Sequence, residues 1–184
     1  MRRLVLFGIL AVSCATPAPL SISAPLPVMA KKEEPPAPPP AVLLPYVAKS
    51  NPGLDAKEAE RVARLIQQVA EEYEIEVPLF AAIIRQESHF RTGQKACRSY
   101  NGIRRCDYGL AQVNSFWIDE LELDAMKLRT DDLYNLRVGA QILKDVLDRH
   151  NGEYGYYNTA DPDLRLSYVT RIERHKKQIL ATLN

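Results

Sequence analysis

The sequence has little excess charge, few cysteines and no long apolar run. Its 24 Lys and Arg residues nearly balance 23 Asp and Glu residues, for a net charge of +1. Because proteins that bind nucleic acids through general electrostatic attraction carry a basic surplus, no nucleic-acid partner is expected. His, Cys, Asp and Glu do not recur at the spacings of a metal site, so neither a metal nor another cofactor is predicted. The apolar run from Leu4 to Val12 is too short for a membrane-spanning helix.

The N-terminus has the pattern of an export signal. Arg2 and Arg3 precede the apolar run, which ends in Ala11-Val12-Ser13-Cys14. This ending resembles the bacterial lipobox, in which the chain is cut before a lipidated cysteine. We therefore expect residues 1–13 to be a lipoprotein signal peptide and Cys14 to carry the lipid. The protein would then lie at the periplasmic face of a bacterial membrane, expected to be the outer membrane; an ordinary signal peptide cut elsewhere is the alternative.

Proline is almost confined to the first part of the chain. Of 13 prolines, only Pro78 and Pro162 follow residue 52. Proline removes backbone donors and favours the extended polyproline II conformation. Residues 14–53 are therefore predicted to be the lipidated cysteine and a semi-rigid tether, and residues 54–184 to be the folded domain.

The two remaining cysteines, Cys97 and Cys106, flank a predicted hairpin. They are equidistant from Asn101-Gly102, a dipeptide that favours a two-residue hairpin turn. Counted outward from this turn, the cysteines fall on a non-hydrogen-bonded pair, where Cα atoms are about 4.5 Å apart. That spacing lies within the range of a disulfide, so Cys97 is predicted to pair with Cys106.

Helical patterns account for most of the rest of the domain. Apolar residues recur at helical spacing after a capping pair, Asp55 and Glu58, which predicts a helix over residues 56–74. A buried helix is expected from Val77, a short helix or turn over 110–117, a longer helix from 131 or 132 to before 151, and a last helix from about 163. The predicted fold class is mainly α, with one small β-hairpin inserted.

Glu87 is the leading candidate for chemistry. It ends the helix that begins at Val77 and is aligned with the buried face of Leu79 and Ile83. An apolar setting disfavours the carboxylate form and raises the pKa of such a side chain. A carboxyl with a raised pKa can serve as a general acid at neutral pH.

Several short motifs occur one after another along the chain, beginning at Glu87. They are Glu87-Ser88, Gly109-Leu110-Ala111-Gln112, Asn135 with Gly139, Tyr157-Asn158, and Tyr168. In this order they resemble the Slt-type lytic transglycosylases, lysozyme-like enzymes that cut bacterial peptidoglycan. The resemblance covers roughly residues 60–182 and implies a lysozyme-like fold. Ala111 stands where the family has Met, and Ala160 stands where it has the Gly of its Tyr-Asn motif.

The resemblance also implies roles for individual residues. Glu87 would be the only catalytic acid. Gln112, Asn135, Tyr157 and Tyr168 would orient sugars, and Ser88 would belong to the same substrate-binding set. Glu87 would protonate the oxygen between N-acetylmuramic acid and N-acetylglucosamine. The resulting carboxylate would then activate the muramic C6 hydroxyl, which would close a 1,6-anhydro ring.

Asp107 leaves a second reaction open. The segment Asp107-Tyr108-Gly109 resembles the corresponding strand of c-type lysozyme, and a disulfide-pinned hairpin would bring Asp107 close to Glu87. Two carboxylates could support hydrolysis, for which lysozyme is the type case. The alternative is that Asp107 hydrogen-bonds backbone at the strand end. Arg98, Arg104 and Arg105 are expected to coat the hairpin, with contact to substrate carboxylates as the alternative.

Three functions therefore remain open at this point. The first is a lytic transglycosylase, the second a lysozyme-type hydrolase using Glu87 and Asp107, and the third a non-catalytic glycan-binding or assembly lipoprotein. The expected partners are peptidoglycan strands, a bacterial membrane through the lipid anchor, and secretion or envelope machinery.

Overall fold

The structure is a computed structural model that describes residues 41–100 and 102–183. The predicted signal peptide, Cys14, most of the predicted tether and Asn101 lie outside the described residues. Among the residues that are described, no helix is both long and apolar enough to cross a membrane.

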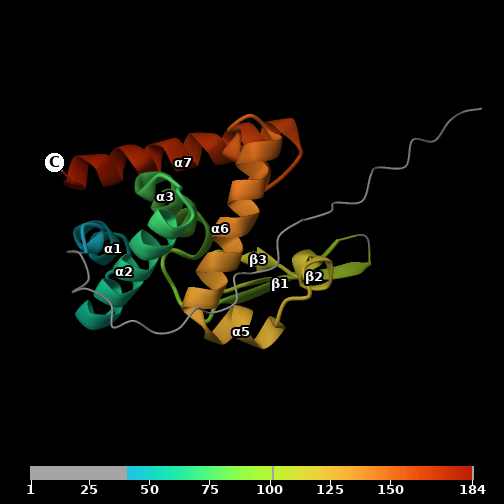
Figure 1. Ribbon diagram of the computed structural model, residues 1–184, viewed down its shortest axis with the longest axis horizontal. Helices are drawn as coiled ribbons and strands as arrows, with labels where there is room; N and C mark the ends of the chain where they lie inside the picture. The colour runs from blue at the N-terminus through green and yellow to red at the C-terminus, as the bar shows by residue number, and fades with distance from the viewer. Residues whose placement is uncertain (1–40, 101, 184) are drawn as a thin grey trace, which may run out of the picture. The chain divides into compact units, whose positions relative to one another are not determined.

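Helices dominate the described part of the chain, which confirms the mainly α, lysozyme-like fold class (Figure 1). The helices are α1 Leu44–Ser50, α2 Ala56–Glu72, α3 Val77–Ser88, α4 Phe116–Glu120, α5 Ala125–Thr130, α6 Asp132–Arg149, the 3₁₀ helix η1 Tyr154–Tyr157, and α7 Pro162–Leu183.

Local signals in the sequence explain where the long helices begin. The Asp55 carboxylate accepts a hydrogen bond from the Glu58 amide at the start of α2, and Asp131 caps α6 in the same way. Pro78 lies in the first turn of α3, where its missing N–H costs no helical hydrogen bond. The helix starts predicted from these residues are confirmed.

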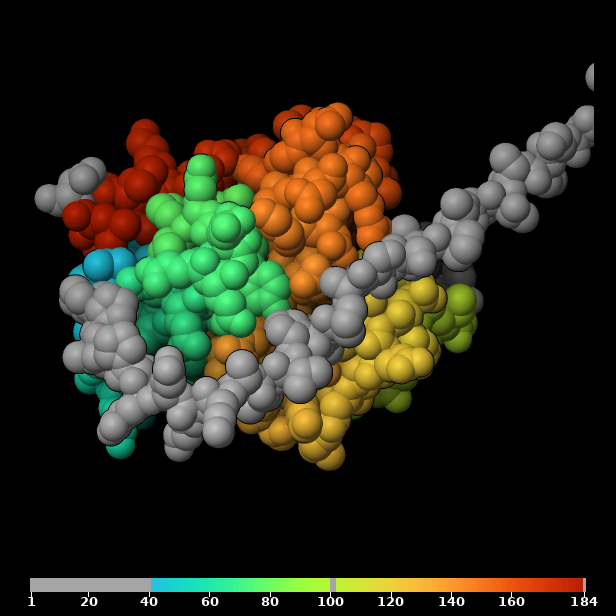
Figure 2. Space-filling view, in the orientation of Figure 1, coloured from blue at the N-terminus to red at the C-terminus, as the bar shows by residue number. Residues whose placement is uncertain are grey.

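Helix α3 is the centre of the packing. All of its residues from Leu79 to Ile84 are buried, because α2 and α7 pack against it. Figure 1 shows α7 lying along α3, with α6 crossing nearby. In the space-filling view the residues of α3, α6 and α7 form a continuous surface on this face (Figure 2).

The tether prediction is wrong for residues 44–50, which form helix α1. Leu43 and Val47 are fully buried and Tyr46 is almost so, and α1 packs against α2 and α7. The prolines dominated the prediction, but Pro45 lies in the first turn of α1, where proline is well tolerated. The packed part of the chain therefore begins before residue 54.

A small antiparallel sheet follows α3, with strands β1 Lys95–Tyr100, β2 Ile103–Tyr108 and β3 Val113–Asn114. The register pairs Cys97 with Cys106, and their sulfur atoms are bonded, which confirms the predicted hairpin and disulfide. Residues 110–117, predicted as a short helix or turn, contain a turn and the start of α4, as expected, and also the unexpected strand β3. The sequence analysis did not anticipate β3 or α5.

If α1 belongs to the folded domain, a truncation in its buried face should destabilise the protein. Leu43→Ala should lower the free energy of unfolding by about 2 to 5 kcal/mol, the usual cost of removing a buried leucine side chain. Val42→Ala is the matched control, because Val42 is 42% exposed. Urea unfolding followed by circular dichroism would measure both. Equal midpoints for the two variants would show that this segment does not contribute to the folded core.

Candidate active site

A cavity of about 410 Å³ lies where the end of α3 meets the sheet, η1 and α7. Five of the predicted site residues line it: Glu87, Asp107, Gln112, Tyr157 and Tyr168. The other lining residues are Gln86, Arg98, Val113, Asn114, Phe116, Trp117, Ile142, Asn158 and Arg171. The fold thus brings residues that are far apart in the sequence to one site.

Glu87 lies in the last turn of α3, with its carboxyl group facing this cavity. The pKa of Glu87 is raised to about 7, mainly by desolvation and also by the nearby Asp107 carboxylate. The Tyr168 hydrogen bond and the charges of Arg171 and Arg98 act in the opposite direction. The position at a helix C-terminus also disfavours a negative charge. Near neutral pH, Glu87 can therefore both hold and release a proton.

Tyr168 positions the Glu87 carboxyl group. Its hydroxyl donates a hydrogen bond to Glu87 Oε1 at 2.8 Å, and the side chain is only 1% exposed. Burial and the neighbouring carboxyl raise the pKa of Tyr168 well above its ordinary value, so the hydroxyl remains a donor. Tyr168 also lines the cavity, so its predicted role in orienting sugars stays a prediction beside this contact with Glu87.

Tyr157 forms another wall of the cavity from η1. Its hydroxyl donates to the Ala111 carbonyl at 2.9 Å, and burial, together with the charges of Glu87 and Asp107, raises its pKa. This bond connects η1 to the turn that carries Gln112. The ring is thereby fixed in place beside the acid.

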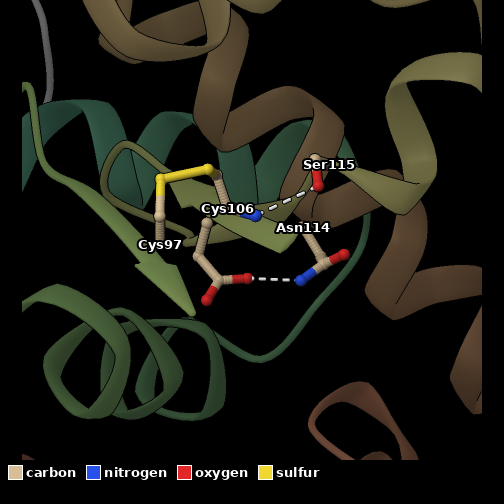
Figure 3. Close-up of a disulfide and its surroundings, with 5 residues drawn as sticks. Cys97, Cys106, Asn114 and Ser115 are labelled. Atoms are coloured by element: carbon tan, nitrogen blue, oxygen red, sulfur yellow. Dashed lines mark hydrogen bonds between the residues drawn. A yellow bond between two sulfur atoms is a disulfide. The ribbon is translucent and has the colours of Figure 1, made fainter. Parts of the chain in front are cut away.

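Asp107 faces the cavity from β2. Its carboxylate accepts a hydrogen bond from Asn114 Nδ2 at 2.6 Å, across the β2–β3 pair. The adjacent Cys106 carries the disulfide, and its amide donates to Ser115 Oγ at 3.1 Å (Figure 3). The disulfide and the third strand together fix the end of β2, and hence the position of Asp107.

Asn135 and Ser88 do not line the cavity, so their expected contact with sugars is not supported. Asn135 is fully buried, and its side chain bonds the Ala111 amide and the carbonyls of Tyr108 and Leu128 at 2.8 to 2.9 Å. The Ser88 hydroxyl donates to the Ile84 carbonyl within α3. Both residues have structural contacts instead: Asn135 fixes the turn after β2, and Ser88 donates to a backbone carbonyl of α3.

Two glycines allow the turn after β2 to lie close to α6. Gly109 has a φ of +70°, and a Cβ there would lie 2.3 Å from Asn135 Nδ2. A Cβ on Gly139 would lie 2.4 Å from the Ala111 Cβ. The close approach brings Gln112 to the cavity with a φ of +47°, and its Nε2 donates to the Gly109 carbonyl. Such backbone strain is typical of functional sites.

The sequence analysis missed Arg171 as a cavity residue and left Arg98 undecided. Arg171 follows Tyr168 by three positions on α7, and helical spacing could have placed both on one face. For Arg98 the deciding information is the strand register, which places it on the cavity side. Asn158 belongs to the Tyr157-Asn158 motif, whereas nothing in the sequence distinguishes Gln86 and Ile142 from ordinary helix residues.

The arrangement suits acid–base chemistry on a polar substrate. It provides one protonatable carboxyl, a second carboxylate, amide side chains and aromatic rings, which are typical partners of sugars. Among residues 41–100 and 102–183, no cluster of three His, Cys, Asp or Glu side chains could hold a metal ion.

Comparison with known proteins identifies one family. The family described as Transglycosylase SLT domain matches residues 64–170, which is more than half of the chain. No significant match is found among curated proteins or among solved structures.

The hydrogen bond from Tyr168 should be measurable in the titration of Glu87. Because this bond favours the charged carboxylate, Tyr168→Phe should raise the pKa of Glu87 above its value of about 7. Tyr154→Phe is the matched control, because it removes a similar hydrogen bond to another carboxyl, that of Glu173, and should leave the pKa of Glu87 unchanged. Carbon-13 NMR of labelled glutamate carboxyls would follow the titration. A pKa that stays unchanged or falls in Tyr168→Phe would refute the positioning role.

Proposed function

Because the chain belongs to the transglycosylase SLT domain family, which acts on peptidoglycan, we propose that it is a lytic transglycosylase with Glu87 as its acid and base. The proposal rests above all on one observation: Glu87 is the cavity carboxyl with a pKa raised to about 7. The matched residues 64–170 include every cavity-lining residue except Arg171. The candidate acid and nearly all of the cavity wall therefore lie within the part of the chain that matches the family.

In the first step, protonated Glu87 donates its proton to the glycosidic oxygen between N-acetylmuramic acid and N-acetylglucosamine. The bond from this oxygen to the muramic C1 breaks, and C1 gains cationic character, which the acetamide of the substrate itself can stabilise. The Tyr168 hydrogen bond, at 2.8 Å, strengthens as the carboxylate forms and so favours the proton transfer.

In the second step, the Glu87 carboxylate takes the proton from the muramic C6 hydroxyl. The C6 oxygen bonds to C1 and closes a 1,6-anhydro ring, so Glu87 is protonated again and no water is consumed. An intramolecular nucleophile is already close to C1, and one protein carboxylate is therefore sufficient. Gln112 and Asn158 offer hydrogen bonds to the sugars, and the Tyr157 and Trp117 rings offer stacking surfaces.

A lysozyme-type hydrolysis is the second candidate, and the position of Asp107 favours it. Asp107 lines the same cavity and acts electrostatically on Glu87. It would stabilise the cationic C1 or form a covalent bond to it while water completes the reaction. Its short bond from Asn114 is equally consistent with holding the β2–β3 pair.

Removal of the Glu87 proton tests both enzymatic functions. Glu87→Gln should reduce cleavage of purified peptidoglycan by a factor on the order of 10² to 10⁴, the usual contribution of a general acid, while the fold persists. Glu120→Gln, a change at an exposed position on α4, is the control and should remain active. Unchanged cleavage by a folded Glu87→Gln protein would contradict both enzymatic functions as assigned to Glu87, whereas a wild-type protein that binds peptidoglycan without cleaving it would favour the non-catalytic function.

The products separate the two reactions. A lytic transglycosylase should yield fragments that end in 1,6-anhydromuramic acid, each lighter by one water molecule than its hydrolytic counterpart. Mass spectrometry after digestion in heavy-oxygen water should then show no label at the new ends. Labelled reducing ends, together with a comparable loss of activity in Asp107→Asn, would instead establish the hydrolase.

We also propose that the domain works at the periplasmic face of a bacterial membrane as a lipoprotein. The support is the Ala11-Val12-Ser13-Cys14 pattern, which lies outside the described residues, and the disulfide, which suits an oxidising compartment. Palmitate labelling in bacteria should depend on Cys14. A Cys14→Ser protein that is exported but still fractionates with membranes would contradict the lipid anchor.

A further inference from the structure

We propose that Arg98, Arg105 and Arg171 form an anion-binding rim on the cavity and select glycan strands whose peptide stems carry free carboxylates. The inference rests on the proposed function, because it assumes that a peptidoglycan strand occupies the cavity. It goes beyond that function in assigning a substrate preference to three particular side chains.

The strand register places Arg98 and Arg105 together on the cavity side of the sheet. They are directly paired across β1 and β2, and Ala96 is paired with Asp107. Because alternate residues of a strand share a face, Arg98, Arg105 and Asp107 lie on one side of the sheet. Arg98 and Asp107 both line the cavity, which agrees with this assignment. Arg104 is paired with Ser99 and therefore lies on the opposite side.

This pair of arginines is unfavourable without an anion. Like charges directly opposite each other on neighbouring strands destabilise a sheet. Both arginines are exposed. Among residues 41–100 and 102–183, neither of them forms an ion pair. The Arg105 guanidinium lies 5.7 Å from the ring centre of Phe116, which also lines the cavity. This contact places the Arg105 guanidinium at the edge of the cavity and does not neutralise its positive charge.

Arg171 supplies a third positive charge, from α7. Its Nη1 donates to Ser167 Oγ at 2.7 Å, whereas its Nε is buried without a hydrogen-bond partner among the described residues. Because Arg171 lines the cavity, an anion that enters the cavity can bind its guanidinium. Arg171 and Arg98 each act electrostatically on Glu87, which places both charges close to the reacting bond.

The peptide stem is the part of the proposed substrate that matches these charges. The sugars of a strand that bears stems are neutral, because the muramic lactyl carboxyl forms the amide bond to the stem, and the stem itself carries free carboxylates. Arginine binds carboxylates through two parallel N–H bonds, a geometry that a hydroxyl cannot satisfy as well. A stem attached to a muramic residue at Glu87 would therefore bring carboxylates within reach of the rim.

Three forms of one soluble glycan strand test this preference: stems with free carboxylates, stems with amidated carboxylates, and strands without stems in which the lactyl carboxyls are amidated. The wild-type protein should show its lowest KM on the first form. In Arg98→Gln/Arg105→Gln the KM on that form should rise about fivefold or more, as expected for loss of partly exposed charge pairs. The KM values on the other two forms should change little, and Arg98→Lys/Arg105→Lys should retain part of the preference.

Arg104→Gln is the matched control, because it removes the same charge from the opposite face of the hairpin. The rim is refuted if Arg98→Gln/Arg105→Gln raises the KM equally on all three forms of the strand. It is also refuted if Arg104→Gln raises the KM on the free-carboxylate form by the same factor. Failure of the proposed function has a different signature, since Glu87→Gln would then cleave all three strands as well as the wild type does.

Discussion

The burial of one carboxyl group at the end of an apolar helix is the constraint on which the site depends. Leu79 to Ile84 are buried because α2 and α7 enclose α3, and this packing carries Glu87 into a poorly solvated position. The same contact between α3 and α7 brings the Tyr168 hydroxyl to Glu87. Desolvation and the hydrogen bond oppose each other, and the pKa of Glu87 is raised to about 7 as their balance. The packing of the core and the raised pKa of Glu87 therefore have one structural cause.

A second requirement is the close contact between the turn after β2 and helix α6. Gly109 and Gly139 leave no room for a Cβ, and the buried Asn135 amide satisfies backbone groups that would otherwise lack partners. The motif residues thus divide into those that face the cavity and those that fix the position of the turn after β2. Gln112 and Tyr157 belong to the first group, whereas Asn135 and the two glycines belong to the second.

The hairpin adds charge to this scaffold. Its register determines which side chains of β1 and β2 face Glu87, and a shift by one residue would exchange Arg98 and Asp107 for residues of the other face. The disulfide between Cys97 and Cys106 and the pairing with β3 both oppose such a shift. The electrostatic field around Glu87 therefore depends on a disulfide whose sulfur atoms take no part in the chemistry.

Local rules in the sequence determined most of the helices, the hairpin, the disulfide and the identity of Glu87 as the leading acid. Capping by Asp55, the apolar run of α3 and the symmetry of the cysteines about the turn act over a few residues, and one chain is enough to recognise them. Tertiary structure decided what depends on distant partners. Helix α1 forms because Leu43, Tyr46 and Val47 are buried against elements far along the chain, which outweighs the proline-rich composition. The hydrogen-bond partners of Tyr168, Asn135 and Arg171 were decided in the same way, because they depend on which groups the fold brings next to each side chain.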